Sequence, residues 1–124
     1  LVRSRGLGDV YKRQDLKACI SYLAVILEHL YKWDNFKNLA SGENAGNKWI
    51  KSIKNARYDI NRMFRRYPSL KHKLPSELQY SWEEAVSRLR NWLVENNQDP
   101  DDFNIPEKCP YTYQEAMERD WSKE

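Results

Sequence analysis

A lone thiol close to two prolines is the first place in this chain where chemistry could occur. Pro106 precedes Cys109 and Pro110 follows it directly. A cysteine acts as a nucleophile when a base or a helix N-terminus lowers the pKa of its thiol. A short helix is expected a few residues later, but no histidine lies near Cys109 in the sequence. We therefore expect a packed or partly packed thiol, and a structural role for Cys109, Pro110 and Tyr111.

His29 is a second candidate for acid–base chemistry. It lies at the edge of an apolar helical stripe, one turn before Trp33. As a general base it would need a partner acid or nucleophile, and the sequence does not place one. The favoured interpretation is a histidine that packs its ring and bonds a backbone group or a carboxylate.

Arg66 and His72 are separated by five residues in a region expected to be helical. This spacing resembles the Arg-to-His signature of the helical HEPN ribonucleases. The resemblance implies a pair that handles phosphate and proton transfer at a ribose hydroxyl. Pro68 interrupts the motif, and a motif this short is common by chance. His29, Arg66 and His72 are thus the candidates for catalysis, although we favour a protein without catalytic activity.

Cofactors and metals are not expected. The two cysteines, Cys19 and Cys109, lie far apart and make no metal or redox spacing. The chain also has no Gly-rich phosphate loop. Cys19 falls on an apolar stripe, where a buried structural thiol is expected.

A basic stripe follows one side of the helix expected over about residues 47–67, with Tyr58 and Asn61 beside it. Lysine and arginine on one face can contact the phosphates of a nucleic acid, and such contacts go to the backbone rather than to the bases. The candidate nucleic-acid-binding residues are Lys51, Lys54, Arg62, Arg65 and Arg66. The plainer interpretation is a solvated face, or one that pairs with the C-terminal half. From Glu77 onward, twelve Asp and Glu stand against five Lys and Arg.

The net charge of +3 resides in the first fourteen residues, because the remaining 110 carry equal numbers of basic and acidic side chains. That segment lacks a starting Met and contains two glycines that spoil any helical periodicity. It resembles the read-through of a sequencing adapter at the ends of translated environmental contigs. We expect residues 1–14 to be a non-native or disordered leader outside the fold.

The composition favours one helical domain with one core. The chain has 124 residues, of which 13% are aromatic, and only four glycines and five prolines. Its longest apolar stretch is too short to span a bilayer, and no secretion signal is recognisable. A cytoplasmic setting is therefore expected.

Apolar residues recur at helical spacing over about residues 15–33, 47–67 and 76–95. The first stretch is apolar around so much of its circumference that it belongs at the centre of a bundle. Thr112 and Glu115 stand at capping-box spacing and predict a last short helix over about 113–120. We expect an all-α bundle of three main helices, followed by an extended arm and this short helix. The residues expected to fill the core are Trp33, Trp49, Trp82 and Leu89.

Four short motifs mark the ends of these elements. They are His29-Leu30-Tyr31-Lys32-Trp33, Trp49-Ile50-Lys51-Ser52-Ile53, Tyr67-Pro68-Ser69-Leu70-Lys71 and Ile105-Pro106-Glu107-Lys108-Cys109-Pro110-Tyr111-Thr112. In order and spacing they resemble the bacterial domain-of-unknown-function family twenty-nine, over about residues 15–121. The resemblance implies an all-helical fold and no established activity.

Members of that family carry further residues, including at least one more helix, ahead of the position matching Asp15. We therefore expect a domain over residues 15–121 that is truncated at its N-terminus. The apolar face of the first helix would then lack a cover at Leu16, Leu23 and Leu30.

Two hypotheses for the function follow. The leading one is a small non-catalytic protein-interaction module, with an unknown protein partner or self-association. The alternative is a nucleic-acid-associated protein, or a HEPN-like ribonuclease or toxin-type protein, that uses the basic face of the second helix. No membrane partner and no small-molecule substrate is expected. Whether the basic face is exposed or buried under the acidic arm distinguishes the two hypotheses.

Overall fold

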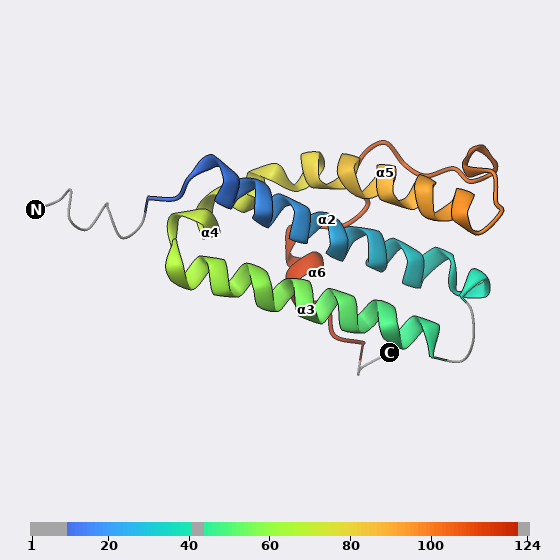
Figure 1. Cartoon of the computed structure of the whole chain (residues 1–124), viewed down its shortest axis with the longest axis horizontal. Coiled ribbons are helices and arrows are strands. Elements are labelled where there is room, and N and C mark those ends of the chain that lie inside the picture. Colours follow the sequence, from blue (N-terminus) through green and yellow to red (C-terminus); the bar gives the residue numbers. More distant parts are fainter. Residues whose placement is uncertain (1–9, 41–43, 122–124) are drawn as a thin grey trace, which may run out of the picture.

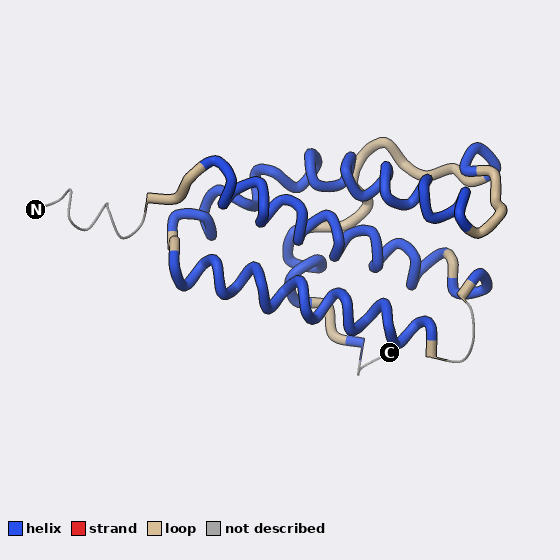
Figure 2. The backbone as a smooth tube through the Cα atoms, viewed as in Figure 1, coloured by secondary structure: helices blue, strands red, loops and turns tan. Residues whose placement is uncertain are grey.

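The computed structural model describes residues 10–40 and 44–121, and they form the all-α bundle that the sequence predicts. Its three long helices are α2 (Arg13–Asn35), α3 (Ala45–Arg66) and α5 (Leu78–Glu95). Figures 1 and 2 show α2 between α3 and α5, with helices as the dominant element and no strand in the described part. None of the described helices combines the length and the apolar character needed to cross a bilayer.

The central helix α2 is buried around most of its circumference. It packs against α3 on one side and α5 on the other, and the C-terminal helix α6 (Tyr113–Glu118) touches it as well. Leu23 and Leu30 are fully buried and Leu16 is half-buried. The face that was expected to lack a cover is thus buried at Leu23 and Leu30 and half-buried at Leu16.

The helix α2 begins two residues earlier than predicted. The backbone N–H of Lys12 donates to the Asp15 carboxylate at 2.7 Å, which fixes the first turn. Tyr11 packs against the core. The last residues of the segment assigned to a leader are therefore part of the folded structure, while residues 1–9 lie outside the described range.

The helix α3 is strongly amphipathic, and its apolar side faces the core. Ile53, Ala56 and Ile60 on that side are buried. The helix ends at Arg66 because Pro68 disfavours the helical conformation in the residue before it. The predicted short turn after it is a further small helix, α4 (Ser69–Lys73), followed by the 3-10 helix η2 (Leu74–Glu77).

The chain reverses direction at the end of α5. Asn97 has φ 60°, the left-handed conformation that asparagine tolerates after a helix. The Gln98 N–H donates to the Leu93 carbonyl at 2.9 Å, and the Asn97 N–H donates to the Val94 carbonyl at 3.0 Å. These two bonds form a Schellman motif, which directs the chain into the 3-10 helix η3 (Pro100–Asp102).

Residues 103–111 form an arm that runs back along α5. The Trp82 indole N–H donates to the Pro106 carbonyl at 2.8 Å and so holds the arm from the buried side. The predicted capping box then starts α6. The Glu115 N–H donates to the Thr112 hydroxyl at 3.0 Å, and the Thr112 N–H donates to the Glu115 carboxylate at 3.0 Å.

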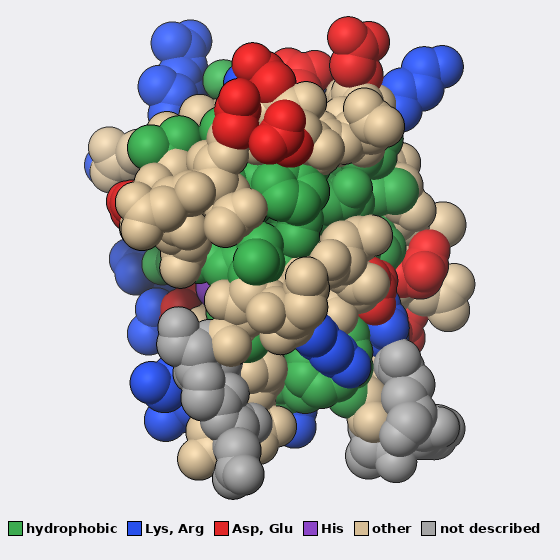
Figure 3. Space-filling model, turned by 90° about the vertical axis from the view of Figure 1, so that its right-hand side faces the viewer, with side chains coloured by type: hydrophobic (Ala, Val, Ile, Leu, Met, Phe, Trp, Pro, Cys, Tyr) green, Lys and Arg blue, Asp and Glu red, His purple; other side chains and the backbone are tan. Residues whose placement is uncertain are grey.

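Aromatic side chains close the end of the bundle where α2 and α5 finish. Phe36 lies beside the 3-10 helix η1 (Lys37–Leu39) and packs edge-on against Phe103 at 5.2 Å. Trp49 and Trp92 join α3 to α5 with ring centroids 5.8 Å apart. Figure 3 shows hydrophobic side chains in the middle of this end.

Candidate functional site

A polar cluster lies within the core, on α2. Lys32 Nζ is 2.7 Å from Glu28 Oε2, and the two side chains are only 5% and 9% exposed. The ammonium also lies 4.4 Å from the centre of the Trp92 ring, a cation–π contact. The carboxylate is thus already engaged by the lysine of its own helix through Oε2. The pair therefore positions side chains between the helices rather than offering a reactive group.

This buried pair was not predicted from the sequence. The signal that could have found it is the spacing of four residues between Glu28 and Lys32, which places both charges on one side of a helix. That side is otherwise apolar, and charged residues are fully buried almost only when they are paired.

His29 packs and bonds a backbone carbonyl, as predicted from its place at the edge of the apolar stripe. Its Nδ1 lies 2.7 Å from the Val25 carbonyl, so the ring donates to the backbone of its own helix. Burial lowers the pKa of His29, although the neighbouring Glu28 opposes the shift. The ring is therefore neutral at pH 7, and no nucleophile contacts it among the described residues.

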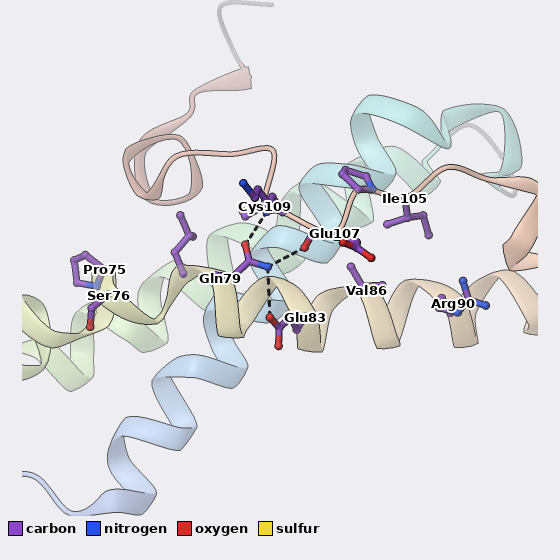
Figure 4. A pocket seen from close by; sticks show the side chains of 12 residues that line it. Pro75, Ser76, Gln79, Glu83, Val86, Arg90, Ile105, Glu107 and Cys109 are labelled. Atoms are coloured by element: carbon purple, nitrogen blue, oxygen red, sulfur yellow. Dashed lines mark hydrogen bonds between the residues drawn. The ribbon is translucent and has the colours of Figure 1, made fainter.

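Cys109 lies on the wall of a groove of about 1060 Å³ between the arm and α5. Figure 4 shows Gln79 of α5 reaching up between Cys109 and Glu107 of the arm. Its side chain accepts from the Cys109 N–H at 2.9 Å and donates to the Glu107 carbonyl at 2.8 Å. Apolar side chains of both elements complete the walls, among them Val86 and Ile105.

The thiol of Cys109 is not activated. Burial raises the pKa of Cys109, and its Sγ lies 3.4 Å from the Tyr111 carbonyl, to which it donates. Cys19 is fully buried, and burial raises its pKa to about 11. Both thiols are thus protonated at pH 7 and poor nucleophiles.

Pro110, Tyr111 and Thr112 lie where the arm turns toward α6. Pro110 is exposed at this turn, whereas the Tyr111 ring is buried. The Tyr111 hydroxyl donates to Asp34 Oδ2 at 2.8 Å, and Thr112 caps the helix that follows. These three residues therefore help to hold the C-terminal segment against the bundle.

Arg66 and His72 are both exposed, at the end of α3 and within α4. The Arg66 guanidinium lies 5.4 Å from the centre of its neighbour's ring, Tyr67. No hydrogen bond joins Arg66 to His72 among the described residues. Nor do the described His, Cys, Asp and Glu residues form a group that could hold a metal ion.

Six exposed cations form what we call the basic face of α3. They are Lys48, Lys51, Lys54, Arg62, Arg65 and Arg66. They lie opposite the buried stripe of Ile53 and Ile60, and from first to last they extend over about 27 Å at the rise of an α-helix. In the described part of the chain, Asp59 is the one carboxylate within ion-pair distance of this face, 3.4 Å from Arg62.

The acidic C-terminal half does not cover the basic face. Three of its carboxylates pair with cations nearby in the sequence: Glu77 with Lys73, Glu84 with Arg88, and Asp101 with Arg90. Figure 3 shows Asp and Glu side chains gathered at the top of the molecule, with Lys and Arg side chains along the lower left. The basic face was expected either to be solvated or to pair with the acidic half. Its six cations are exposed, so the face is solvated.

Arg57 is the cation of α3 that does not belong to this face. Its guanidinium donates to the carbonyls of Ala116 at 2.8 Å, Arg119 at 2.9 Å and Glu115 at 3.2 Å. Arg119 in turn pairs with Asp34. These long-range contacts carry no sequence signal, because the partners are 58 to 85 residues apart.

The family model of Domain of unknown function DUF29 matches residues 9–122 of the chain. The chain belongs to the DUF29 family. DUF29 is the family whose motifs the sequence resembles, so that expectation is confirmed, and the all-helical fold agrees with it. No curated protein and no solved structure gives a significant match. The description of the family gives no activity.

Proposed function

We propose that this DUF29 protein is a non-catalytic nucleic-acid-binding protein, and that the basic face of α3 holds the phosphates. The observation that carries the proposal is the exposure of six cations on one helix, with Asp59 as their one carboxylate partner in the described part of the chain. Unpaired lysine and arginine attract the phosphate backbone without regard to sequence. This is the alternative of the two functional hypotheses, and the absence of an acidic cover among the described residues favours it.

Salt dependence tests the proposal most directly. If all six cations contact phosphates, the logarithm of the binding constant should fall with the logarithm of salt concentration with a slope of about −4 to −5. The measurement is fluorescence anisotropy of labelled RNA and DNA over a salt series. The double variant Arg62→Ala/Arg66→Ala should bind more weakly and with a slope smaller in magnitude by about 2.

The double variant Arg88→Ala/Arg90→Ala is the matched control. It removes two exposed arginines from α5 and changes the net charge by the same amount. An equal loss of binding in both double variants would show that net charge, and not the basic face, attracts the polyanion. Binding that is absent at low salt in the wild-type chain would refute the proposal.

The groove between the arm and α5 favours a second candidate, the protein-interaction module. Apolar side chains line it and polar groups surround them, which is the usual character of a binding site. On this proposal a partner segment packs against Val86. The test is co-purification with the product of a neighbouring gene, which should be lost in Val86→Glu while Val94→Glu retains it. Val94 is an exposed apolar residue of the same helix outside the groove lining.

A further inference from the structure

Tyr58 lies in the middle of the basic face of α3, and its residue is 62% exposed. None of the ring pairs or cation–ring contacts among the described residues involves it. The ring therefore contributes little to the fold and is free to meet a ligand.

Two of the four nearest neighbours of Tyr58 on the helix surface are cations, and the other two are the polar residues Asn55 and Asn61. Lys54 and Arg62 are four residues before and after it, so their Cβ atoms lie about 6 Å from that of Tyr58. Lys51 and Arg65 are seven residues away on the same side, about 10 Å along the axis. The ring is thus placed between positive charges in both directions along α3.

Exposure alone would not single out this tyrosine, because isolated exposed aromatic residues are normal. Tyr80 of α5 is exposed to the same 62%, but it shares a shallow hollow with Glu83 and Glu84. Those carboxylates would repel a phosphate. What distinguishes Tyr58 is an exposed aromatic face together with surrounding positive charge.

We propose that the basic face of α3 takes single-stranded nucleic acid, with an unpaired base stacked on Tyr58 and the flanking phosphates held by Lys54 and Arg62. This inference rests on the proposed function of the same face. Stacking on an aromatic ring between cations is how proteins hold single strands without reading sequence. A duplex hides its base faces and shows only base edges in its grooves, so it offers Tyr58 no stacking surface.

A negatively charged lipid surface is the competing source of phosphate. It fits less well, because the apolar side of α3 is buried against the core and has no side chains left to insert. Only charge would hold the helix at such a surface, and Tyr58 would add little.

The test compares oligonucleotides of about 12 nucleotides, a length within the usual site size for single strands. Oligothymidylate and oligouridylate are measured against a DNA duplex of the same length, by anisotropy at fixed low salt, on the full chain. Tyr58→Ala should weaken binding of the single strands about 5- to 150-fold, the loss expected for one stacked base. Duplex binding should change little.

Two variants control for other causes. Tyr58→Phe keeps the ring and should bind single strands nearly as the wild type does. Tyr80→Ala removes an equally exposed tyrosine and should leave binding unchanged. Circular dichroism of each variant verifies the helical content, which should be retained because both rings are exposed.

The outcomes separate this inference from the proposed function. Unchanged single-strand binding in Tyr58→Ala, or an equal loss for single strands and duplex, would overturn the inference and leave the proposed function standing. Failure of the wild-type chain to bind any of the oligonucleotides would overturn both. Binding to vesicles containing phosphatidylserine, with none to the oligonucleotides, would also overturn both and assign the face to a lipid surface.

Discussion

Asp34 joins the end of α2 to the C-terminal segment through three hydrogen bonds. The Arg119 guanidinium donates to its two oxygens at 2.8 and 2.9 Å, and the Tyr111 hydroxyl donates at 2.8 Å. Partial burial pushes the pKa of Asp34 upward, but the bonds from Arg119 and Tyr111 outweigh it and lower the pKa below its ordinary value of 3.8. The carboxylate is therefore held in its charged form.

We expect Asp34→Asn to destabilise the protein by about 2 kcal/mol near pH 7, because it removes a charged partner from Arg119. A lowered folded-state pKa gives stability that is present above pH 3.8 and is lost as the pH falls through the lower folded value. The variant should therefore lose less stability than the wild type on acidification below about pH 4. Urea unfolding at several pH values measures this difference.

Asp102→Asn is the control for this experiment, since that carboxylate is exposed on η3. It should leave both the stability and its pH dependence nearly unchanged. If the free energy of unfolding fell equally with decreasing pH in the wild type and in Asp34→Asn, Asp34 would have no role in binding the C-terminal segment.

At the scale of elements, a residue of α3 supplies the hydrogen bonds that the C-terminal end of α6 lacks. The last carbonyls of a helix have no partner within the helix, and a cation near them is favourable. Arg57 satisfies three carbonyls of the segment from Glu115 to Arg119. A helix of six residues is too short to be stable by itself, so its position is set by this contact and by its packing.

We expect Arg57→Met to release α6 from the bundle and to lower the free energy of unfolding by about 2 kcal/mol. Methionine keeps a long apolar side chain but has no hydrogen bonds to donate. Hydrogen exchange followed by mass spectrometry should show faster exchange in α6, with the amides of α2 nearly unchanged.

Lys54→Met is the matched substitution, one turn earlier on the exposed side of the same helix. It should leave exchange in α6 as it is in the wild type. If the two variants exchanged alike, the three hydrogen bonds of Arg57 would not be what holds α6 in place.

At the scale of the whole molecule, the aromatic residues join elements that are distant in sequence. Trp33 of α2 packs edge-on against Trp121 at 6.5 Å, and Trp49 of α3 packs against Trp92 of α5. Trp82 is fully buried and bonds the arm. All five tryptophans therefore contact an element other than their own.

We expect one cooperative unfolding transition, because a single core includes residues of α2, α3, α5 and α6. Thermal unfolding followed by tryptophan fluorescence should coincide with unfolding followed by far-ultraviolet circular dichroism. Two separated transitions would show that the C-terminal segment folds independently of the three long helices.

The sequence determined the three long helices, their order and the cap of α6, because these depend on neighbours within a few turns. The apolar spacing predicted α2, α3 and α5 to within about two residues at each end, and the Thr112–Glu115 spacing predicted the start of α6. The family motifs are local in the same way. Even the basic face of α3 is a property of one helix, so its members could be named from spacing alone.

Only the tertiary structure decided what surrounds these elements. Whether the basic face was covered depended on where the acidic half folds, and the six cations of that face are exposed. The contacts of Asp34 and Arg57 with the C-terminal segment and the groove beside Cys109 join residues tens of positions apart. Spacing along one helix carries no information about such contacts, because they depend on how the helices pack together.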